Sequence, residues 1–283
     1  MNIVIIPNLT RENTYEITLK LCETLDSLGF SYALLNQDNV SDVFPGYKII
    51  SANELKSYAD ILMPVGGDGT MINAAQYALP LNIPILGVNA GKLAYLMGLE
   101  ANETGLLSKL LTNDYTIEER FVLRVDVYDE TKRLVLSDFC INEVVFARGA
   151  EIKQTALDFY CDGRFINRYN SDGIIIATPT GSTAYNLSAG GPIVDPRIES
   201  IIFSPICPHS LVERTVIFSS DSEFRIENPG ISCKTLLSCD GRECVHFGAG
   251  YSAKIRKSNM KFKFIRLNDD TFMEILHKKM KVK

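Results

Sequence analysis

The sequence predicts an α/β domain with a parallel sheet, then an all-β domain of the sandwich type, then a final helix. Three observations support this fold class. Short apolar runs alternate with helical patterns up to about Met97, short β-rich runs follow from about Glu119, and a helical pattern returns after Asp269. We therefore assign residues 1–100, together with a return segment at 267–283, to the α/β domain, and residues 101–266 to the β-sandwich domain.

The α/β domain begins with the apolar run Ile3–Ile6, which predicts a buried strand. An amphipathic helix is expected over Thr10–Leu28, where apolar residues recur at helical spacing, and Gly29 stands where a helix C-cap belongs. The further expected elements are strands at Tyr32–Leu35, Ile61–Val65 and Ile83–Val88, and helices at Thr70–Ala78 and Glu100–Asn113.

The β-sandwich domain is predicted from a series of short β-rich runs. Asp162-Gly163 between two of these runs is a hairpin signal. The final pattern, Asp269–Met280, predicts a helix that returns to the first domain. The expected strands are Phe121–Tyr128, Leu134–Phe139, Glu143–Phe146, Thr155–Tyr160, Phe165–Tyr169, Gly173–Ala177, Ser200–Ser204, Thr215–Phe218 and Phe224–Glu227.

Composition excludes several classes of protein. The 283 residues are 46% hydrophobic, so the chain is not of the disordered class. With 29 basic and 34 acidic residues the net charge is −5, which argues against a nucleic-acid partner. The apolar runs are shorter than the ~18 residues of a membrane helix, so no membrane partner is expected. The seven cysteines, in a chain too large to need disulfides, favour a cytoplasmic location.

The strongest local signal is the loop Val65–Thr70, which joins an apolar strand to a helix. Its three glycines let a ligand approach the backbone, and N–H groups at a helix N-terminus suit phosphate. Asp68 is unusual among phosphate-binding amides, and its carboxylate fits a base for an acceptor hydroxyl or a group that helps to hold a metal ion. The alternative is a Gly-rich turn in which the aspartate caps the helix.

Two weaker signals follow. Hydroxyl residues and glycines are dense between Thr178 and Pro192, with Tyr185 among them, and Asp172 stands at a strand start. Asn142-Glu143 precedes another apolar strand. The alternative for Thr178–Pro192 is a plain polar loop with a short helix. Asp172 could be only a turn residue, and Asn142-Glu143 only a pair on the surface.

The sequence gives little support for a structural zinc site or for a Ser-His-Asp catalytic triad. The spacing of Cys239, Cys244 and His246 is too loose for a structural zinc site, and we expect no metal-ligating residues. The three histidines of the chain offer little for a Ser-His-Asp triad.

Four motifs together resemble the NAD kinase family, whose members phosphorylate the 2′-hydroxyl of the adenosine ribose of NAD to make NADP. The resemblance implies a Rossmann-like α/β domain, an NAD-binding β-sandwich domain, and a homodimer or homotetramer. The expected phosphoryl donor is ATP with Mg²⁺, or another phosphoryl donor. The motifs are Gly66–Thr70, Asn142-Glu143, Asp172-Gly173 with Thr178–Pro192, and Pro205–Leu211.

The resemblance also implies roles for single residues. Asp68 corresponds to the base that acts on the 2′-hydroxyl. The residues implied in nucleotide binding are Gly66, Gly67, Gly69 and Thr70 for phosphates, Asn142 and Glu143 for adenosine, Asp172 for the nicotinamide side, Thr183, Ala184, Tyr185, Asn186 and Ser188 for the adenine pocket, and Lys153, Asn170 and Arg242 for other parts of NAD.

Two other functions share part of these signals. A lipid kinase of the diacylglycerol type has the same Gly-Gly-Asp-Gly-Thr loop, but the polar segment Thr180–Asn186 and the lack of a membrane-docking segment argue against it. A dinucleotide-binding sensor without catalysis keeps the pocket, and the intact Asp68 argues against that alternative.

Overall fold

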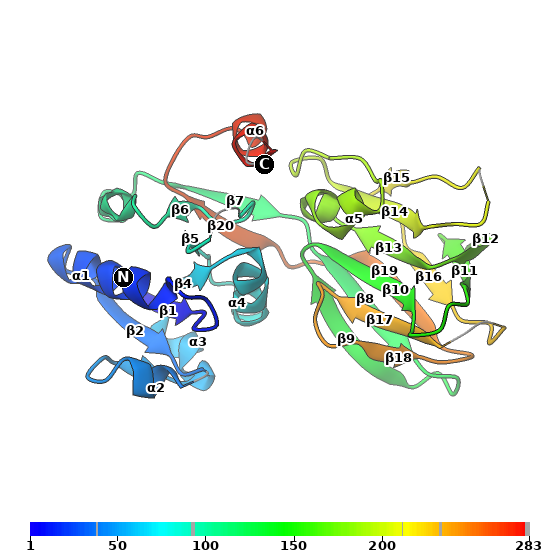
Figure 1. The fold of residues 1–283 in the computed structure, drawn as a ribbon, viewed down its shortest axis with the longest axis horizontal. Helices are drawn as coiled ribbons and strands as arrows, with labels where there is room; N and C mark the ends of the chain where they lie inside the picture. The colour runs from blue at the N-terminus through cyan, green and yellow to red at the C-terminus, as the bar shows by residue number, and fades with distance from the viewer. Residues whose placement is uncertain (38, 92–93, 211, 232–233, 281–283) are drawn as a thin grey trace. The chain divides into compact units, whose positions relative to one another are not determined.

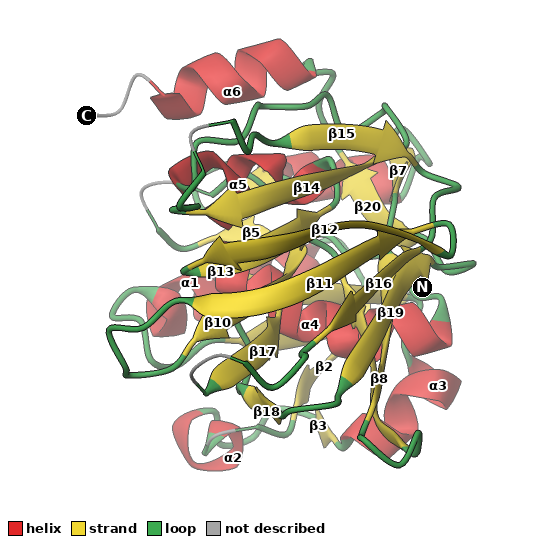
Figure 2. Ribbon diagram, turned by 90° about the vertical axis from the view of Figure 1, so that its right-hand side faces the viewer, coloured by secondary structure: helices red, strands yellow, loops and turns green. Residues whose placement is uncertain are grey.

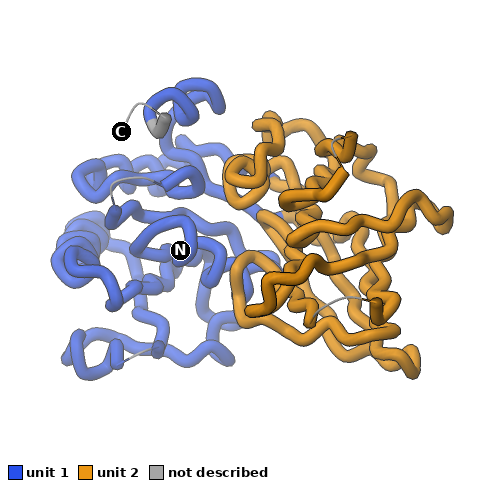
Figure 3. Tube along the Cα trace, turned by 45° about the vertical axis from the view of Figure 1, so that its right-hand side comes forward, with its two compact units in different colours: residues 1–119, 262–283 blue, residues 120–261 orange. Residues whose placement is uncertain are grey.

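The computed structural model describes residues 1–37, 39–91, 94–210, 212–231 and 234–280. The chain forms two compact units, unit 1 of Met1–Glu119 with Phe262–Lys283 and unit 2 of Arg120–Lys261 (Figure 3). Leu211 of the last family-like motif and residues 281–283 of the expected return segment lie outside the described residues. Within the described residues no helix is long and apolar enough to cross a membrane.

The units differ from the domain limits expected from sequence at residues 100 and 267. Leu107, Leu110 and Ile265, which the sequence assigned to the second domain, all belong to the apolar core of unit 1. The segments just beyond the expected limits therefore bury their apolar side chains with the α/β sheet, and contacts assign them to unit 1.

Unit 1 is built on a sheet with strand order β3-β2-β1-β4-β5-β6, in which every pairing is parallel (Figure 1). This is the Rossmann-like arrangement expected from the sequence. The elements are β1 (Asn2–Pro7), α1 (Thr14–Ser27), β2 (Ser31–Leu35), α2 (Val40–Val43), β3 (Ile49–Ile50), η1 (Ala52–Glu54), α3 (Leu55–Tyr58), β4 (Ile61–Gly66), α4 (Asp68–Leu81), β5 (Val88–Asn89), β6 (Leu99–Glu100), η2 (Thr104–Leu110), β7 (Thr116–Arg120), β20 (Phe262–Arg266) and α6 (Phe272–Met280).

Three expected boundaries in unit 1 were wrong. Helix α1 begins at Thr14 rather than Thr10, because the Asn8 side chain accepts hydrogen bonds from the backbone N–H and the hydroxyl of Thr10 and holds a turn there. The expected strand Ile83–Val88 forms only a bridge at Ile85 before β5 begins. The expected helix over 100–113 is the 3₁₀ helix η2.

Other details of unit 1 match the expectation. Gly29 ends α1 with a φ of 75°, and the N–H of Phe30 bonds to the carbonyl of Leu25, as in a glycine-terminated helix. Helix α6 belongs to unit 1 and buries Leu276. Thr271 and Glu274 cap it through reciprocal hydrogen bonds.

Unit 2 consists of two six-stranded antiparallel sheets, with orders β15-β14-β13-β10-β17-β18 and β12-β11-β16-β19-β8-β9 (Figure 2). The elements are β8 (Leu123–Tyr128), β9 (Leu134–Cys140), β10 (Glu143–Arg148), β11 (Thr155–Cys161), β12 (Arg164–Ser171), β13 (Gly173–Ala177), η3 (Thr180–Thr183), α5 (Tyr185–Ser188), β14 (Ser200–Ile206), β15 (Val216–Ser219), β16 (Phe224–Glu227), β17 (Thr235–Cys239), β18 (Val245–Phe247) and β19 (Ser252–Lys257).

The two sheets of unit 2 enclose one core with phenylalanines at its centre. Phe159 of one sheet stacks on Phe203 of the other, with 4.3 Å between ring centroids, and Phe224 packs edge-on against Phe159. Asp162 and Gly163 both have positive φ and form the expected hairpin turn between β11 and β12. The β-sandwich predicted from the sequence is thus confirmed.

Candidate active site

The first candidate region lies in unit 1, where the order in which the chain adds strands to the sheet reverses. From β1 the chain runs outward through β2 to β3, then returns to β4 on the other side of β1 and runs outward to β6 in the opposite direction. In open α/β sheets, ligands bind at the carboxyl ends of strands at such a switch point. The loop after β4 that begins α4 carries Gly66 to Thr70, and the loop after β1 runs beside it, with the N–H of Asn8 bonded to the carbonyl of Val65.

The glycines of this loop have different structural roles. A Cβ on Gly66 would lie 2.2 Å from the Thr70 hydroxyl oxygen, whereas a Cβ on Gly69 would meet nothing within 4 Å. The Thr70 hydroxyl accepts hydrogen bonds from the Gly67 N–H at 3.3 Å and from the Asn8 side-chain amide at 2.9 Å. Thr70 therefore braces the loop, and Gly66 gives it the room to do so.

Asp68 is held in place by backbone groups from a distant part of the chain. Its two carboxylate oxygens accept hydrogen bonds from the backbone N–H groups of Tyr95 and Leu96, both at 2.8 Å. Asp68 is half-buried. Each carboxylate oxygen has a second lone pair, so this anchored side chain can still accept a proton or a hydrogen bond.

Arg11 is a cation at this loop that the sequence analysis missed. A Cβ on Gly67 would lie 2.8 Å from one terminal guanidinium nitrogen of Arg11, and a Cβ on Gly91 would lie 2.7 Å from the other. Within the described residues the guanidinium has no carboxylate or hydrogen-bond partner. Because adjacent parallel strands end at the same edge of a sheet, an arginine soon after the first strand could have been predicted to lie near the glycine loop that follows β4.

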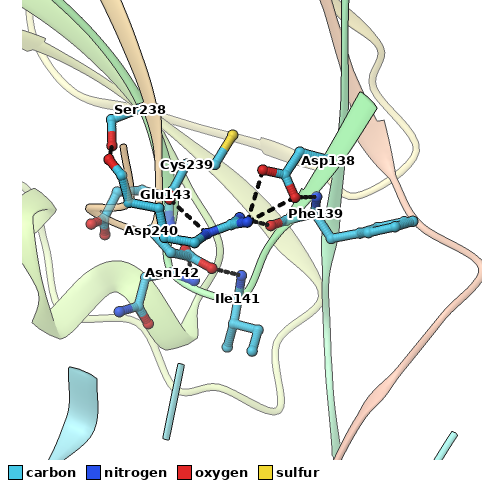
Figure 4. A network of polar contacts seen from close by, with 9 residues as sticks. Asp138, Phe139, Ile141, Asn142, Glu143, Ser238, Cys239 and Asp240 are labelled. Atoms are coloured by element: carbon cyan, nitrogen blue, oxygen red, sulfur yellow. Dashed lines mark hydrogen bonds and ion pairs between the residues drawn. The ribbon is translucent and has the colours of Figure 1, made fainter. Parts of the chain in front are cut away.

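A second candidate region is in unit 2, where Asn142 directly precedes β10 and Glu143 begins it (Figure 4). The Asp240 carboxylate accepts hydrogen bonds from the backbone N–H groups of Ile141 at 2.8 Å, Asn142 at 2.8 Å and Glu143 at 3.0 Å. The N–H of Asp240 in turn donates to the Glu143 carbonyl at 2.9 Å. The turn after β17 thus fixes the turn that carries the Asn-Glu pair.

Glu143 is a buried carboxyl with an open hydrogen-bonding position. Glu143 is 6% exposed, and its side-chain Oε2 has no hydrogen-bond partner within the described residues. Burial and, secondly, the charge of Asp240 raise the pKa of Glu143 to about 8, while a hydrogen bond from the Tyr185 backbone N–H acts in the opposite direction. Burial also raises the pKa of Asp240 to about 6, against the lowering effect of its three amide partners. A buried oxygen without a protein partner is a position that a water, an ion or a ligand can fill.

The segment after β13 packs tightly against the Asn-Glu turn. A Cβ on Gly181 would lie 2.2 Å from the Asn142 carbonyl oxygen, so the segment approaches as closely as glycine allows. The Asn186 side chain is fully buried, donates to the carbonyls of Ser182 and Pro192, and accepts from the Ser204 hydroxyl. Asn186 therefore supports the segment from inside.

The other expected residues of this segment are more accessible. Thr183 and Ala184 are half-buried, and Ser188 is exposed. The Tyr185 side chain lies 43% exposed at the start of α5.

The remaining expected NAD-binding residues are spread over unit 2. Asn170 and Lys153 are exposed, and Asp172 is bonded at 3.0 Å to Arg148, a cation that the sequence analysis did not single out. The Arg242 guanidinium donates to the carbonyls of Cys239 and Phe139 and pairs with Asp138 at 2.8 Å. In the part of the chain that the structure describes, no three His, Cys, Asp or Glu side chains gather as a metal site.

Comparison with known proteins gives two family matches that together cover most of the chain. The model of the ATP-NAD kinase N-terminal domain matches residues 23–115, and that of the C-terminal domain matches residues 141–267. An NAD kinase of Caldanaerobacter subterraneus subsp. tengcongensis is 35% identical over 98% of this chain and 97% of its own length. An NAD kinase of Coxiella burnetii (strain Dugway 5J108-111) is 34% identical, over 91% and 89%.

Solved structures show the same fold. The crystal structure of yeast NADH kinase complexed with NADH has a TM-score of 0.87 at 24% identity, covering 100% of this chain and 87% of the yeast chain. The crystal structure of an NAD kinase from Archaeoglobus fulgidus in complex with ATP has a TM-score of 0.78 at 25% identity, covering 100% of both chains.

Proposed function

The chain belongs to the ATP-NAD kinase family and is an NAD kinase by activity, and we propose that Asp68 is the base of its phosphoryl transfer. The reaction moves the terminal phosphoryl group of ATP to the 2′-hydroxyl of the adenosine ribose of NAD and yields NADP. The observation that carries the proposal is the anchoring of Asp68 by two backbone amides at the start of α4. A carboxylate held in this way can accept a hydrogen bond from the ribose hydroxyl and orient its oxygen toward phosphorus.

The phosphates of the donor need positive charge and N–H donors. The first turn of α4 presents N–H groups that have no partner within the helix, and Gly69, beside which a Cβ would meet nothing within 4 Å, leaves room for phosphate to approach them. Gly66 and Gly67 leave room for the Thr70 side chain and the Arg11 guanidinium. Arg11 adds a planar cation over Gly67 and Gly91, and a guanidinium binds phosphate with two parallel hydrogen bonds. ATP is bound by the Archaeoglobus fulgidus relative, and we expect ATP with Mg²⁺, as one substrate, to be the donor here.

NAD would be held by unit 2. Asn142 and Glu143 would bind the adenosine part, with the unpartnered Oε2 of Glu143 as a contact point. Thr183, Ala184, Tyr185 and Ser188 would line the adenine pocket, while Asp172, Asn170 and Lys153 would meet other parts of the dinucleotide. Because the Asn186 and Arg242 side chains are bonded within the protein, their part in NAD binding would be to hold these segments in place.

The test measures NADP formation from NAD, ATP and Mg²⁺ through a coupled dehydrogenase. Asp68→Asn should lower turnover by about 10²- to 10⁴-fold and keep NAD binding, since loss of a general base has that size of effect. Asp42→Asn, which changes an exposed aspartate in the first turn of α2, is the matched control and should keep full turnover. In the same assay, Arg11→Ala should raise the KM for ATP about tenfold and leave NAD binding unchanged.

Other results would contradict these assignments. Full turnover in Asp68→Asn would remove that residue as the base. Binding of NAD without any product in the unsubstituted protein would favour the sensor, and product formed on lipid micelles but not on NAD would favour the lipid kinase.

We also propose that the protein self-associates as a homodimer or homotetramer. Apolar side chains on two edge strands of unit 2 support this, because Val216 and Ile217 on β15 and Phe165 and Ile166 on β12 are 43–55% exposed. Light scattering on the purified protein would give its mass in solution.

The expected cytoplasmic location likewise stays a proposal, which fractionation of cells that make the protein would test.

A further inference from the structure

We propose that Asp240 is a positioning residue of the dinucleotide site, acting on Asn142 and Glu143 through three main-chain hydrogen bonds and through its charge. The inference rests on the proposed function, since it takes these two residues as contacts to NAD. The sequence motifs assigned no role to Asp240. In this turn they implied a contact with NAD only for Arg242.

The first argument is the geometry of the two turns. One oxygen of Asp240 accepts the N–H groups of Asn142 and Glu143, and the other accepts that of Ile141, so both oxygens are needed (Figure 4). Asp240 itself has a φ of 51° and Gly241 a φ of 69°, left-handed conformations that Asp and Gly tolerate. The turn thereby aims the carboxylate at three consecutive amides, which would lack a partner without it.

The second argument is that this turn is fixed from its other side. The Arg242 guanidinium donates to the carbonyls of Cys239 and Phe139 and pairs with Asp138, and the Arg242 carbonyl accepts the Ser238 hydroxyl. These bonds join the end of β9 to the end of β17. Asp240 is therefore presented by a rigid frame, and its contacts with the Asn-Glu turn restrict the backbone that carries Glu143.

The third argument is electrostatic. The charge of Asp240 opposes ionisation of Glu143, and the pKa values of about 6 and about 8 leave Asp240 ionised and Glu143 protonated at neutral pH. The other titratable groups around the pair are Asp138, Arg242 and the buried thiols of Cys140 and Cys239. A protonated Glu143 can donate a hydrogen bond, so NAD binding should weaken as the pH rises through the pKa of Glu143.

The experiment measures NAD binding by calorimetry without ATP between about pH 6 and pH 9, together with the KM for each substrate. In Asp240→Asn the side-chain NH₂ replaces one carboxylate oxygen and faces a backbone N–H that it cannot accept. The negative charge next to Glu143 is also lost. We expect the dissociation constant of NAD to rise about tenfold or more while the KM for ATP changes less than about twofold. The pH at which NAD binding weakens should also move downward, because the pKa of Glu143 falls without the nearby charge.

Two further variants keep the inference open to refutation. Asp138→Asn removes a carboxylate bonded to the same frame but leaves the three amide bonds of Asp240, and it should keep the wild-type pH profile. Glu143→Gln should abolish the pH dependence of NAD binding above about pH 7, where Asp240 is already ionised, and in that background Asp240→Asn should shift no profile in this range. This double-variant comparison tests the charge effect even if Asp240→Asn lowers stability.

The outcomes separate the inference from the function beneath it. Unchanged NAD affinity and pH profile in Asp240→Asn, in a protein that makes NADP, would overturn the role of Asp240 and leave the kinase assignment intact. A pH dependence above about pH 7 that survives in Glu143→Gln would overturn the charge effect, since Asp240 is already ionised there. An unsubstituted protein that makes no NADP would instead refute the proposed function.

Discussion

At the scale of single residues, the candidate-site groups that the sequence predicts are those that lie in short continuous motifs. Gly66 to Thr70 form one loop, so the motif and the site coincide there. Arg11 and Asp240 could not be found in this way, because their partners are far along the chain. Asp240 and Ile141 are 99 positions apart, and only the pairing of β10 with β17 brings the two turns together.

Glu143 also makes stability depend on pH. The folded protein keeps the proton up to a pKa of about 8, whereas the unfolded chain releases it near pH 4.5. Between these values unfolding releases a proton, so the free energy of unfolding should fall by about 1.4 kcal/mol per pH unit as pH rises. Above about pH 8 this dependence should end, because both states are then ionised.

Urea unfolding of the wild-type protein and of Glu143→Gln, at several pH values from about 6 to 8, checks this expectation. Between about pH 7 and pH 8 the difference between the two free energies should change with pH, since most other groups cancel in the subtraction. Asp240, with a pKa of about 6, is half ionised at the lower limit of the window and interacts with Glu143, so points near pH 6 report both groups. Parallel pH slopes for the two proteins would contradict the burial argument.

At the scale of elements, strong periodicity and apolar runs predicted the strands β1, β2 and β4, the helices α1 and α4, and most strands of unit 2. The elements that were missed or misplaced are short. The four-residue helices α2 and α3 and the two-residue strands β3, β5 and β6 are too short to show a period, and neighbouring strands decide where they form. Helix α1 starts later than expected because the Asn8 side chain, rather than a helical backbone carbonyl, accepts the hydrogen bond of the Thr10 N–H.

The start of α4 gives a prediction that compares two glycines of one loop. Gly66→Ala should lower stability by about 1–3 kcal/mol, since its Cβ would overlap the Thr70 hydroxyl at 2.2 Å and displace a brace of the loop. Gly69→Ala should leave the protein as stable or slightly more stable, since its Cβ meets nothing within 4 Å. Thermal unfolding of both variants is the measurement, and equal shifts in Tm would show that the loop relaxes around either methyl group.

At the scale of the whole molecule, the sequence indicated two domains and a returning C-terminus, and the change of pattern near Glu119 coincides with the end of the first segment of unit 1. The sequence did not show where the return begins. β20 reads like one more strand of the β-rich half, and only its place in the core of unit 1 separates it: Phe262, Phe264 and Ile265 are each 1% exposed.

Truncation tests the dependence of unit 1 on its second segment. A chain that ends at Lys261 loses β20 and its buried side chains, each worth about 1.5–3 kcal/mol, which together approach the stability of a whole domain. Limited proteolysis should then degrade residues 1–119 and leave residues 120–261 resistant, because unit 2 has its own core.

A chain that ends at Asp270 is the matched control, since it lacks α6 but keeps β20. It should resist proteolysis in both units. Equal sensitivity of residues 1–119 in the two truncated chains would mean that β20 contributes little to unit 1.

The interrupted course of unit 1 along the chain has a consequence for biosynthesis. A ribosome completes residues 120–261 before it adds the segment that unit 1 lacks. The middle unit can therefore fold during translation, whereas the nascent first segment must wait, without the buried side chains that β20 adds to its core, until the last residues emerge. The order of folding is then the reverse of the order in which the two units begin, and the first unit to start is the last to complete its core.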